Sequence, residues 1–117
     1  IIEKDNPDIY DYKVPARLKE LHQTKDFGQY ADKDGKIHVA FTASNHTTGG
    51  NSGSPVINAN GELIGVNFDL NGEGTMSDIM YDPQMCRNIS LDIRYALFII
   101  DKFAGANHLI KEMDIRK

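Results

Sequence analysis

One serine of this chain lies in a glycine-rich turn with the surroundings that a nucleophile requires. Ser52 stands within the run Gly50-Asn51-Ser52-Gly53-Ser54-Pro55, directly before an apolar segment. A serine that attacks a carbonyl carbon is exposed on a tight turn, and backbone N–H groups beside it converge on the oxygen that becomes negative. Small residues on both sides permit that geometry. The run therefore predicts a nucleophile for acyl transfer.

Two arrangements of a nucleophilic serine compete for this turn. In the elbow of α/β-hydrolases a helix follows Gly-x-Ser-x-Gly, but here Ser54 replaces the last glycine and a strand-like Pro55-Val56-Ile57 follows. In double-barrel serine proteases the turn lies between strands, and the N–H groups of the serine and of the residue two before it form the oxyanion hole. Gly50 and Ser52 fit these two roles, because a glycine leaves the first peptide free to take the required orientation.

A serine nucleophile also needs a histidine base and an orienting carboxylate. His46 lies only six residues before Ser52, where a residue lines the specificity pocket or forms an ordinary turn. His22, His38 and His108 stand on a predicted helix, on a predicted strand and near the C-terminus, and their positions do not indicate a base. In double-barrel proteases the histidine and aspartate come from the first barrel, so we expect this chain to lack both.

The elements around the turn are mostly short strands. Residues 36–42 alternate polar and apolar side chains and predict a strand, with the turn residues 32–35 before it. Residues 55–58 and 62–68 flank Asn60-Gly61, the strongest short signal for a β-hairpin. Residues 69–74 read as a loop, and residues 79–81 and 88–90 as short strands.

Helical patterns lie at the two ends of the chain. Leucines three apart predict an amphipathic helix over residues 15–25, and apolar spacing predicts a packed helix over residues 92–104 that stops at Gly105. A shorter amphipathic turn is expected at residues 109–113, whereas residues 1–14 read as an extended connector.

Composition excludes several classes of function. The net charge is −4 and the lysines and arginines are scattered, so there is no footprint for nucleic acid or an anionic membrane. No stretch is apolar over the ~18 residues of a membrane span. Cys86 is the single cysteine and permits no internal disulfide. We expect no metal and no cofactor. The chain opens Ile1-Ile2 without an initiator methionine or a signal peptide, so we expect a piece of a longer protein.

The turn and its surroundings resemble the C-terminal end of the bacterial dipeptidyl-peptidases 7 and 11, a family of chymotrypsin-like serine exopeptidases. The resemblance rests on residues 47–58, 61–69 and 92–102, and residues 15–32 and 103–113 are closer to type 11. It implies removal of dipeptides from free N-termini, a double β-barrel with a helical cap, homodimers, and a periplasmic or cell-surface location.

The resemblance also assigns roles to single residues. Ser52 would be the nucleophile, and the N–H groups of Gly50 and Ser52 the oxyanion hole. Asp69 matches the acidic residue that grips the substrate's α-ammonium. Leu70 follows Asp69. At this position, family members that select acidic P1 residues carry arginine, and those that select apolar P1 residues carry glycine. Gly72 stands where these enzymes usually have tryptophan. Leu70 leaves three possibilities: an apolar pocket, a subgroup that reads P1 with other residues, or an altered sequence.

Position 51 departs from trypsin-like proteases in a further way. Asn51 stands where those enzymes carry an aspartate that pairs with a newly cut N-terminal ammonium. An uncharged side chain cannot form that ion pair, so activation by a new Ile1 terminus is not expected.

We therefore expect a mainly β chain with helices, part of the second barrel of a double barrel, with a short N-terminal helix and a packed C-terminal helix. Residues 1–14 would connect to residues 15–117, the nucleophile-bearing portion of a peptidase domain. The chain alone would be inactive and would depend on the remainder of the protein. A glutamyl-type endopeptidase fragment and a noncatalytic protease-like binding module remain open.

Overall fold

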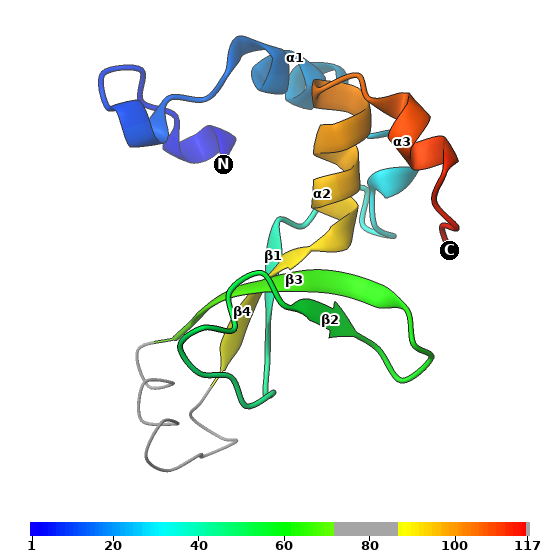
Figure 1. The fold of residues 1–117 in the computed structure, drawn as a ribbon. Helices are drawn as coiled ribbons and strands as arrows, with labels where there is room; N and C mark the ends of the chain where they lie inside the picture. The colour runs from blue at the N-terminus through cyan, green and yellow to red at the C-terminus, as the bar shows by residue number, and fades with distance from the viewer. Residues whose placement is uncertain (72–86, 117) are drawn as a thin grey trace.

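A four-stranded antiparallel sheet carries the serine turn, and short helices pack beyond one end of it (Figure 1). The structure is a computed structural model that describes residues 1–71 and 87–116. Its strands are β1 (Ala40–Ala43), β2 (Pro55–Ile57), β3 (Leu63–Leu70) and β4 (Asn88–Asp92), in the spatial order β1-β4-β3-β2. β2 and β1 form the two edges, and the long β3 lies between β2 and β4.

The hairpin of β2 and β3 confirms the strongest signal in the sequence. Its turn is closed by the Asn58 side chain, whose Oδ1 accepts from the N–H groups of Asn60 and Glu62 at 2.9 and 3.0 Å. Gly61 has a φ of +79°, a left-handed value that glycine adopts without strain.

A glycine sets the close approach of β3 to its neighbours. A Cβ at Gly65 would lie 2.6 Å from the Leu91 carbonyl oxygen and 2.8 Å from the Phe41 ring. The absent side chain therefore lets the ring from β1 cross β4 and cover the backbone of β3.

The main apolar core lies among the helices, not on the sheet. The helices are α1 (Ala16–Thr24), α2 (Ile93–Phe98) and α3 (Asn107–Lys111), with a 3₁₀ turn at Gly28–Tyr30. Their buried side chains form one cluster: Leu21, Tyr30, Leu97, Phe98 and Ile110. On the sheet, Val56 is the buried large apolar side chain among the described residues, so most of the sheet contributes little core.

The helix predicted for residues 92–104 is present but changes type. Asp92 caps its start by accepting the Arg94 N–H at 2.9 Å, and α2 continues into a π-helical segment at Ile99–Phe103. The Ala104 N–H there donates to the Ile99 carbonyl five residues earlier, at 2.8 Å. Gly105 ends the segment with a φ of +67°, as predicted.

Other predicted elements need correction. Asp69 and Leu70 were expected in a loop, but they pair with Ile89 and Asn88 as the last residues of β3. β1 begins only at Ala40, and β4 runs two residues beyond its predicted end. The predicted strand at residues 79–81 and the position of Gly72 lie outside the described residues.

The first fourteen residues fold back instead of extending. They contain 3₁₀ turns at Ile2–Lys4 and Tyr10–Tyr12. The Asn6 N–H donates to the Tyr12 carbonyl at 2.9 Å, and Asp5 accepts the Val14 N–H at 2.9 Å. Asp5 also pairs with Lys19 of α1, which ties this segment to the helical layer.

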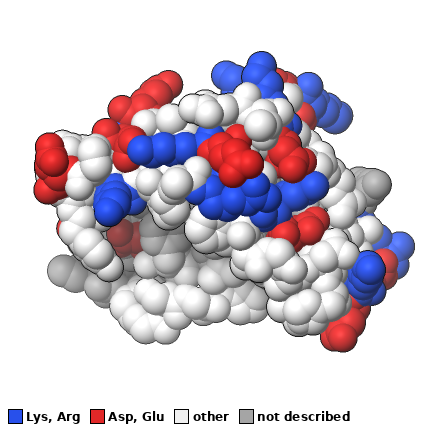
Figure 2. All heavy atoms as spheres, turned by 90° about the horizontal axis from the view of Figure 1, so that it is seen from above, with Lys and Arg blue, Asp and Glu red and all other residues white. Residues whose placement is uncertain are grey.

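Charges of both signs alternate over the helical face of the molecule (Figure 2). Several are paired there, including Arg17 with Glu20 and Lys102 with Asp26. Within the described part of the chain, no helix combines the length and apolar character that crossing a bilayer requires.

Candidate active site

Two consecutive β-turns that share Asn51 build the serine segment. The first is closed by the Asn51 N–H donating to the Thr48 carbonyl at 3.2 Å, and the second by the Ser54 N–H donating to the Asn51 carbonyl at 3.0 Å. The third residue of each turn is a glycine with positive φ, +93° at Gly50 and +88° at Gly53. Type II turns require such left-handed values at their third residue, which explains why both positions are occupied by glycine.

Asn67 of β3 makes three hydrogen bonds to the double turn. Its carbonyl accepts the Gly53 N–H at 2.7 Å, and its own N–H donates to the Ser54 carbonyl at 2.9 Å. Its side-chain amide donates to the Asn51 carbonyl at 3.1 Å. The Asn51 side chain is used within the turn as well, because its Oδ1 accepts the Thr48 N–H at 2.7 Å.

Ser52 stands exposed at the second position of the second turn. Its hydroxyl donates to the Phe68 carbonyl at 3.2 Å. Among the described residues, the N–H groups of Gly50 and Ser52 donate to no protein acceptor. The segment thus presents one hydroxyl and two unoccupied backbone donors together.

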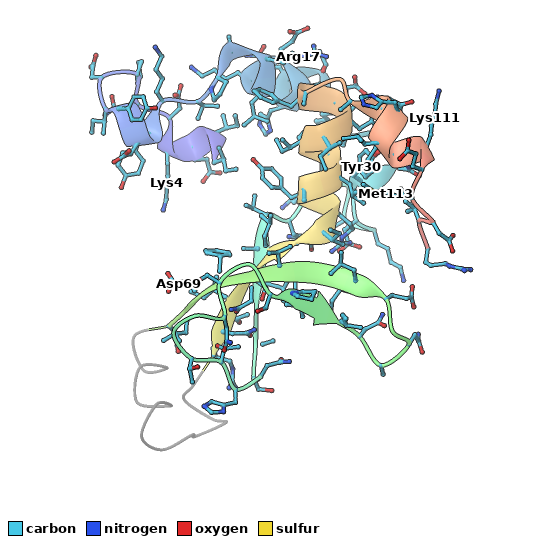
Figure 3. All side chains as sticks on the ribbon, in the orientation of Figure 1. Lys4, Arg17, Tyr30, Asp69, Lys111 and Met113 are labelled. Atoms are coloured by element: carbon cyan, nitrogen blue, oxygen red, sulfur yellow. The ribbon has the colours of Figure 1, made fainter. Side chains whose placement is uncertain are left out.

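A small depression of about 110 Å³ opens beside Ser52. One wall is the approach to the turn, and the other is the end of β3. Its lining residues are Thr47, Thr48, Gly49, Ser52, Asn67, Phe68, Asp69 and Leu70. Asp69 lies toward the end of β3 (Figure 3), and its Oδ1 accepts the Leu70 N–H at 2.8 Å. The sheet therefore brings the predicted residues Ser52, Asp69 and Leu70 to one depression.

No histidine meets the serine in the described part of the chain. His22 and His108 lie on α1 and α3, and His38 contacts Asp34 at 2.9 Å between Nε2 and Oδ2. His46 is exposed, and the residues that line the depression begin after it. The base and its carboxylate are not assembled by these residues.

A buried polar network under the turn was not predicted from the sequence. The Asn88 amide donates to Asn67 Oδ1 at 3.3 Å and to Ser90 Oγ at 3.4 Å. All three side chains are 5% exposed or less. In the sequence, the sign of this network is the alternation of polar and apolar residues along β4. The polar residues occupy its buried positions: Asn88, Ser90 and Asp92. Such an inverted pattern indicates hydrogen-bonded groups and not an apolar core.

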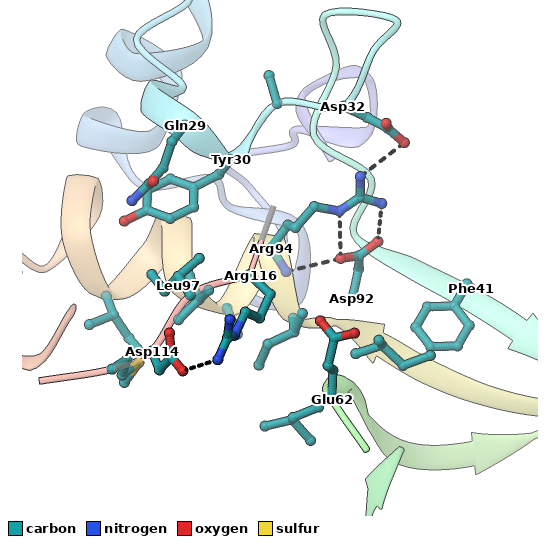
Figure 4. Close-up of a pocket in the computed structure, with 18 of the residues that line it drawn as sticks. Gln29, Tyr30, Asp32, Phe41, Glu62, Asp92, Arg94, Leu97, Asp114 and Arg116 are labelled. Atoms are coloured by element: carbon teal, nitrogen blue, oxygen red, sulfur yellow. Dashed lines mark hydrogen bonds and ion pairs between the residues drawn. The ribbon is translucent and has the colours of Figure 1, made fainter. Parts of the chain in front are cut away.

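A larger open cleft of about 1520 Å³ lies between the helices and the sheet (Figure 4). Arg94 is bound there by Asp92 at 2.8 Å and by Asp32 at 3.0 Å. The Lys33 N–H and the Arg94 guanidinium lower the pKa of Asp32, and the paired carboxylates raise that of Arg94. Arg116 is likewise bound by Asp114 at 2.7 Å. The serine turn does not line this cleft, so we place the candidate site at Ser52.

Over residues 1–71 and 87–116, His, Cys, Asp and Glu side chains form no group of three with metal-binding geometry. The groups at the depression include the Ser52 hydroxyl, backbone N–H groups and the Asp69 carboxylate. They are suited to nucleophilic attack with stabilisation of an oxyanion.

Comparison with known proteins gives one consistent result. The peptidase S46 family profile matches residues 1–115. An Asp/Glu-specific dipeptidyl-peptidase of Capnocytophaga gingivalis is 59% identical over the full chain, and dipeptidyl-peptidase 7 of Phocaeicola vulgatus is 54% identical over 98% of it. In both cases the chain spans 16% of the relative's length.

A solved structure shares the fold. The crystal structure of Porphyromonas endodontalis DPP11 in complex with the dipeptide Arg-Asp superposes with a TM-score of 0.94 at 55% identity. The match covers 98% of this chain and 16% of that one. The arrangement of strands and helices described above thus occurs as one part of a much larger protein.

Proposed function

This chain belongs to the peptidase S46 family, and we propose that, within a longer protein, it supplies the nucleophile of a serine-type dipeptidyl-peptidase. The observation that carries the proposal is the double turn, which leaves Ser52 exposed beside two backbone N–H groups with no protein acceptor among the described residues. Relatives named as dipeptidyl-peptidases match 100% and 98% of the chain.

The reaction is acyl transfer. Ser52 Oγ attacks the carbonyl carbon of the second substrate residue, while a histidine from the remainder of the protein takes the hydroxyl proton. The negative oxygen binds the N–H groups of Gly50 and Ser52. The carbon–nitrogen bond then breaks, and the leaving amine takes the proton. Water hydrolyses the ester that remains on Ser52 and releases the dipeptide.

Asp69 binds the free N-terminus of the substrate and so restricts cleavage to the second peptide bond. Its carboxylate lies at the same depression as Ser52, is exposed, and is the charged group among the described lining residues. A carboxylate at this place attracts the α-ammonium of a free N-terminus. Fixing that ammonium positions the second peptide bond at the nucleophile.

Leu70 favours an uncharged P1 residue. Relatives named Asp/Glu-specific match this chain, yet its depression has no lysine or arginine among the described lining residues. The sequence itself has none between Lys36 and Arg87. Among the described lining residues a P1 carboxylate beside Leu70 and Asp69 would find no cation, and its desolvation would then cost several kcal/mol. Of the three possibilities left by the sequence, we propose the apolar pocket.

The remainder of the protein completes the fold. Within the described residues the sheet is open at β1 and β2, and barrels remove such edges by closure. Ile57, Leu63 and Phe68 of the sheet are about half exposed. We propose that missing strands close this sheet as the second barrel, that the complete protein is homodimeric, and that it acts in the periplasm or at the cell surface, as the family resemblance implies.

The test uses the complete gene product. We expect it to release dipeptidyl fluorophores from substrates with a free amine and to spare the same peptides with a blocked amine. Ser52→Ala should abolish turnover. Cleavage inside blocked peptides would support the glutamyl-type endopeptidase instead, and a folded protein without either activity would support the noncatalytic module.

A further inference from the structure

The side chain of Asn67 hydrogen-bonds the peptide group that carries the Ser52 N–H. Its Nδ2 donates to the Asn51 carbonyl at 3.1 Å, and the Ser54 N–H donates to the same oxygen at 3.0 Å. This carbonyl belongs to the peptide that joins Asn51 to Ser52. In a planar trans peptide the carbonyl and the N–H point in opposite directions. Fixing the Asn51 oxygen toward β3 therefore directs the Ser52 N–H away from β3.

We propose that Asn67 is a positioning residue that holds the Ser52 N–H in the orientation of an oxyanion donor. The proposal rests on the proposed acyl-transfer function. A single β-turn bond from Ser54 leaves the peptide free to tilt, whereas a second donor from another element restrains it. Asn67 also exchanges two backbone hydrogen bonds with Gly53 and Ser54, so its side chain reaches the carbonyl from a fixed backbone.

The surroundings of Asn67 fix its amide. The side chain is 5% exposed, and its Oδ1 accepts from Asn88 Nδ2 at 3.3 Å. The Asn51 carbonyl assigns the nitrogen and oxygen of Asn67, because only a donor can face a carbonyl, and this leaves Oδ1 toward Asn88. Asn88 in turn donates to the fully buried Ser90 hydroxyl at 3.4 Å. The contacts of Asn88 and Ser90 restrain the Asn67 side-chain amide, and this amide in turn restrains the double turn.

Asn51 adds the complementary restraint. Its Oδ1 accepts the Thr48 N–H at 2.7 Å, and its own N–H donates to the Thr48 carbonyl at 3.2 Å. Trypsin-like proteases use an aspartate and a new N-terminus at this place. Here the Asn51 side chain binds the Thr48 N–H, and the Asn67 side chain binds the Asn51 carbonyl.

The experiment compares Asn67→Asp with the wild-type complete protein. Aspartate keeps the size and keeps an acceptor for Asn88, but it replaces the donor to the Asn51 carbonyl by an oxygen. We expect kcat to fall between about 10-fold and 100-fold with KM within about threefold. The affinity for a dipeptide aldehyde, whose oxygen occupies the oxyanion site, should fall by the same factor as kcat. The affinity for the product dipeptide should not change.

Two further variants separate positioning from folding. Asn67→Ala removes the donor without adding charge and should show the same division between kcat and KM. Asn58→Ala removes comparable asparagine contacts from the far turn of the hairpin. It should lower the melting temperature without the loss of aldehyde affinity.

The proposal is overturned if folded Asn67→Asp and Asn67→Ala proteins keep kcat within about threefold of wild type. Equal losses of aldehyde and product affinity would also overturn it, because they would indicate a disordered pocket. Wild-type turnover tests the proposed function, whereas the ratio of variant to wild type tests Asn67, so the two failures are distinguishable.

Discussion

Replacing Leu70 by arginine should redirect the complete protein toward acidic P1 residues. Leu70 lines the depression beside Ser52, and its backbone is held by pairing with Asn88 and by the bond from its N–H to Asp69. An arginine at this fixed position can meet a P1 carboxylate with charge-assisted hydrogen bonds. Such bonds contribute about 1.5–3 kcal/mol.

The size of the change follows from that energy. Since about 1.4 kcal/mol corresponds to tenfold, the ratio of kcat/KM for P1 Asp over P1 Leu should rise roughly 10-fold to 150-fold. Asp69 beside the new guanidinium competes for it, which places the expectation toward the lower end of this range. The loss of kcat/KM for P1 Leu should be smaller, because Phe68 still lines the depression.

The assay compares fluorogenic dipeptides that differ only in P1, at low and high salt. Leu70→Gln is the matched control, because it adds length and polarity without charge and should leave the ratio within about threefold of wild type. A wild-type preference for P1 Asp would refute the reasoning, as would an equal rise of the ratio in the glutamine variant.

Three further predictions follow from single contacts. The isolated chain should not label at Ser52 with a fluorophosphonate, because no histidine bonds this serine in the described part of the chain; stoichiometric labelling would contradict the need for a base from the remainder. Gly65→Ala should destabilise the protein by about 1–3 kcal/mol in chemical denaturation, because its Cβ would meet the Leu91 carbonyl oxygen at 2.6 Å; Gly49→Ala, with open space and no positive φ, is the matched comparison. The Tyr30 hydroxyl bonds Asp101 at 2.7 Å and lowers the pKa of that carboxyl from 3.8. A lowered pKa stabilises above the unfolded value, so the melting-temperature gap between wild type and Tyr30→Phe should be constant near neutral pH and shrink as the pH falls below 3.8; a gap that widens in acid would show the opposite sign.

Local chemistry explains what could be predicted along the chain. The Asn60-Gly61 hairpin and the stop at Gly105 depend on a few adjacent residues, so their signals survive in the sequence alone. The same holds for Gly50 and Gly53, whose positive φ values build the turn around Ser52.

Predictions failed where distant residues decided the outcome. Asp69 and Leu70 looked like loop residues, because aspartate, asparagine and glycine make up most of residues 69–74, but pairing with β4 extends β3 through both. The helix after Asp92 has a regular apolar period, yet its second half is π-helical, a change that its spacing does not signal.

The sequence by itself determined that Ser52 lies in a glycine-rich tight turn directly before a strand, because a tight turn is a property of consecutive residues. Only the tertiary structure decided that Asp69 and Leu70 share a depression with Ser52, and that Asn67 holds the carbonyl of the peptide preceding this serine. Those relations join residues about sixteen positions apart, and they arise from strand pairing, which no local pattern encodes.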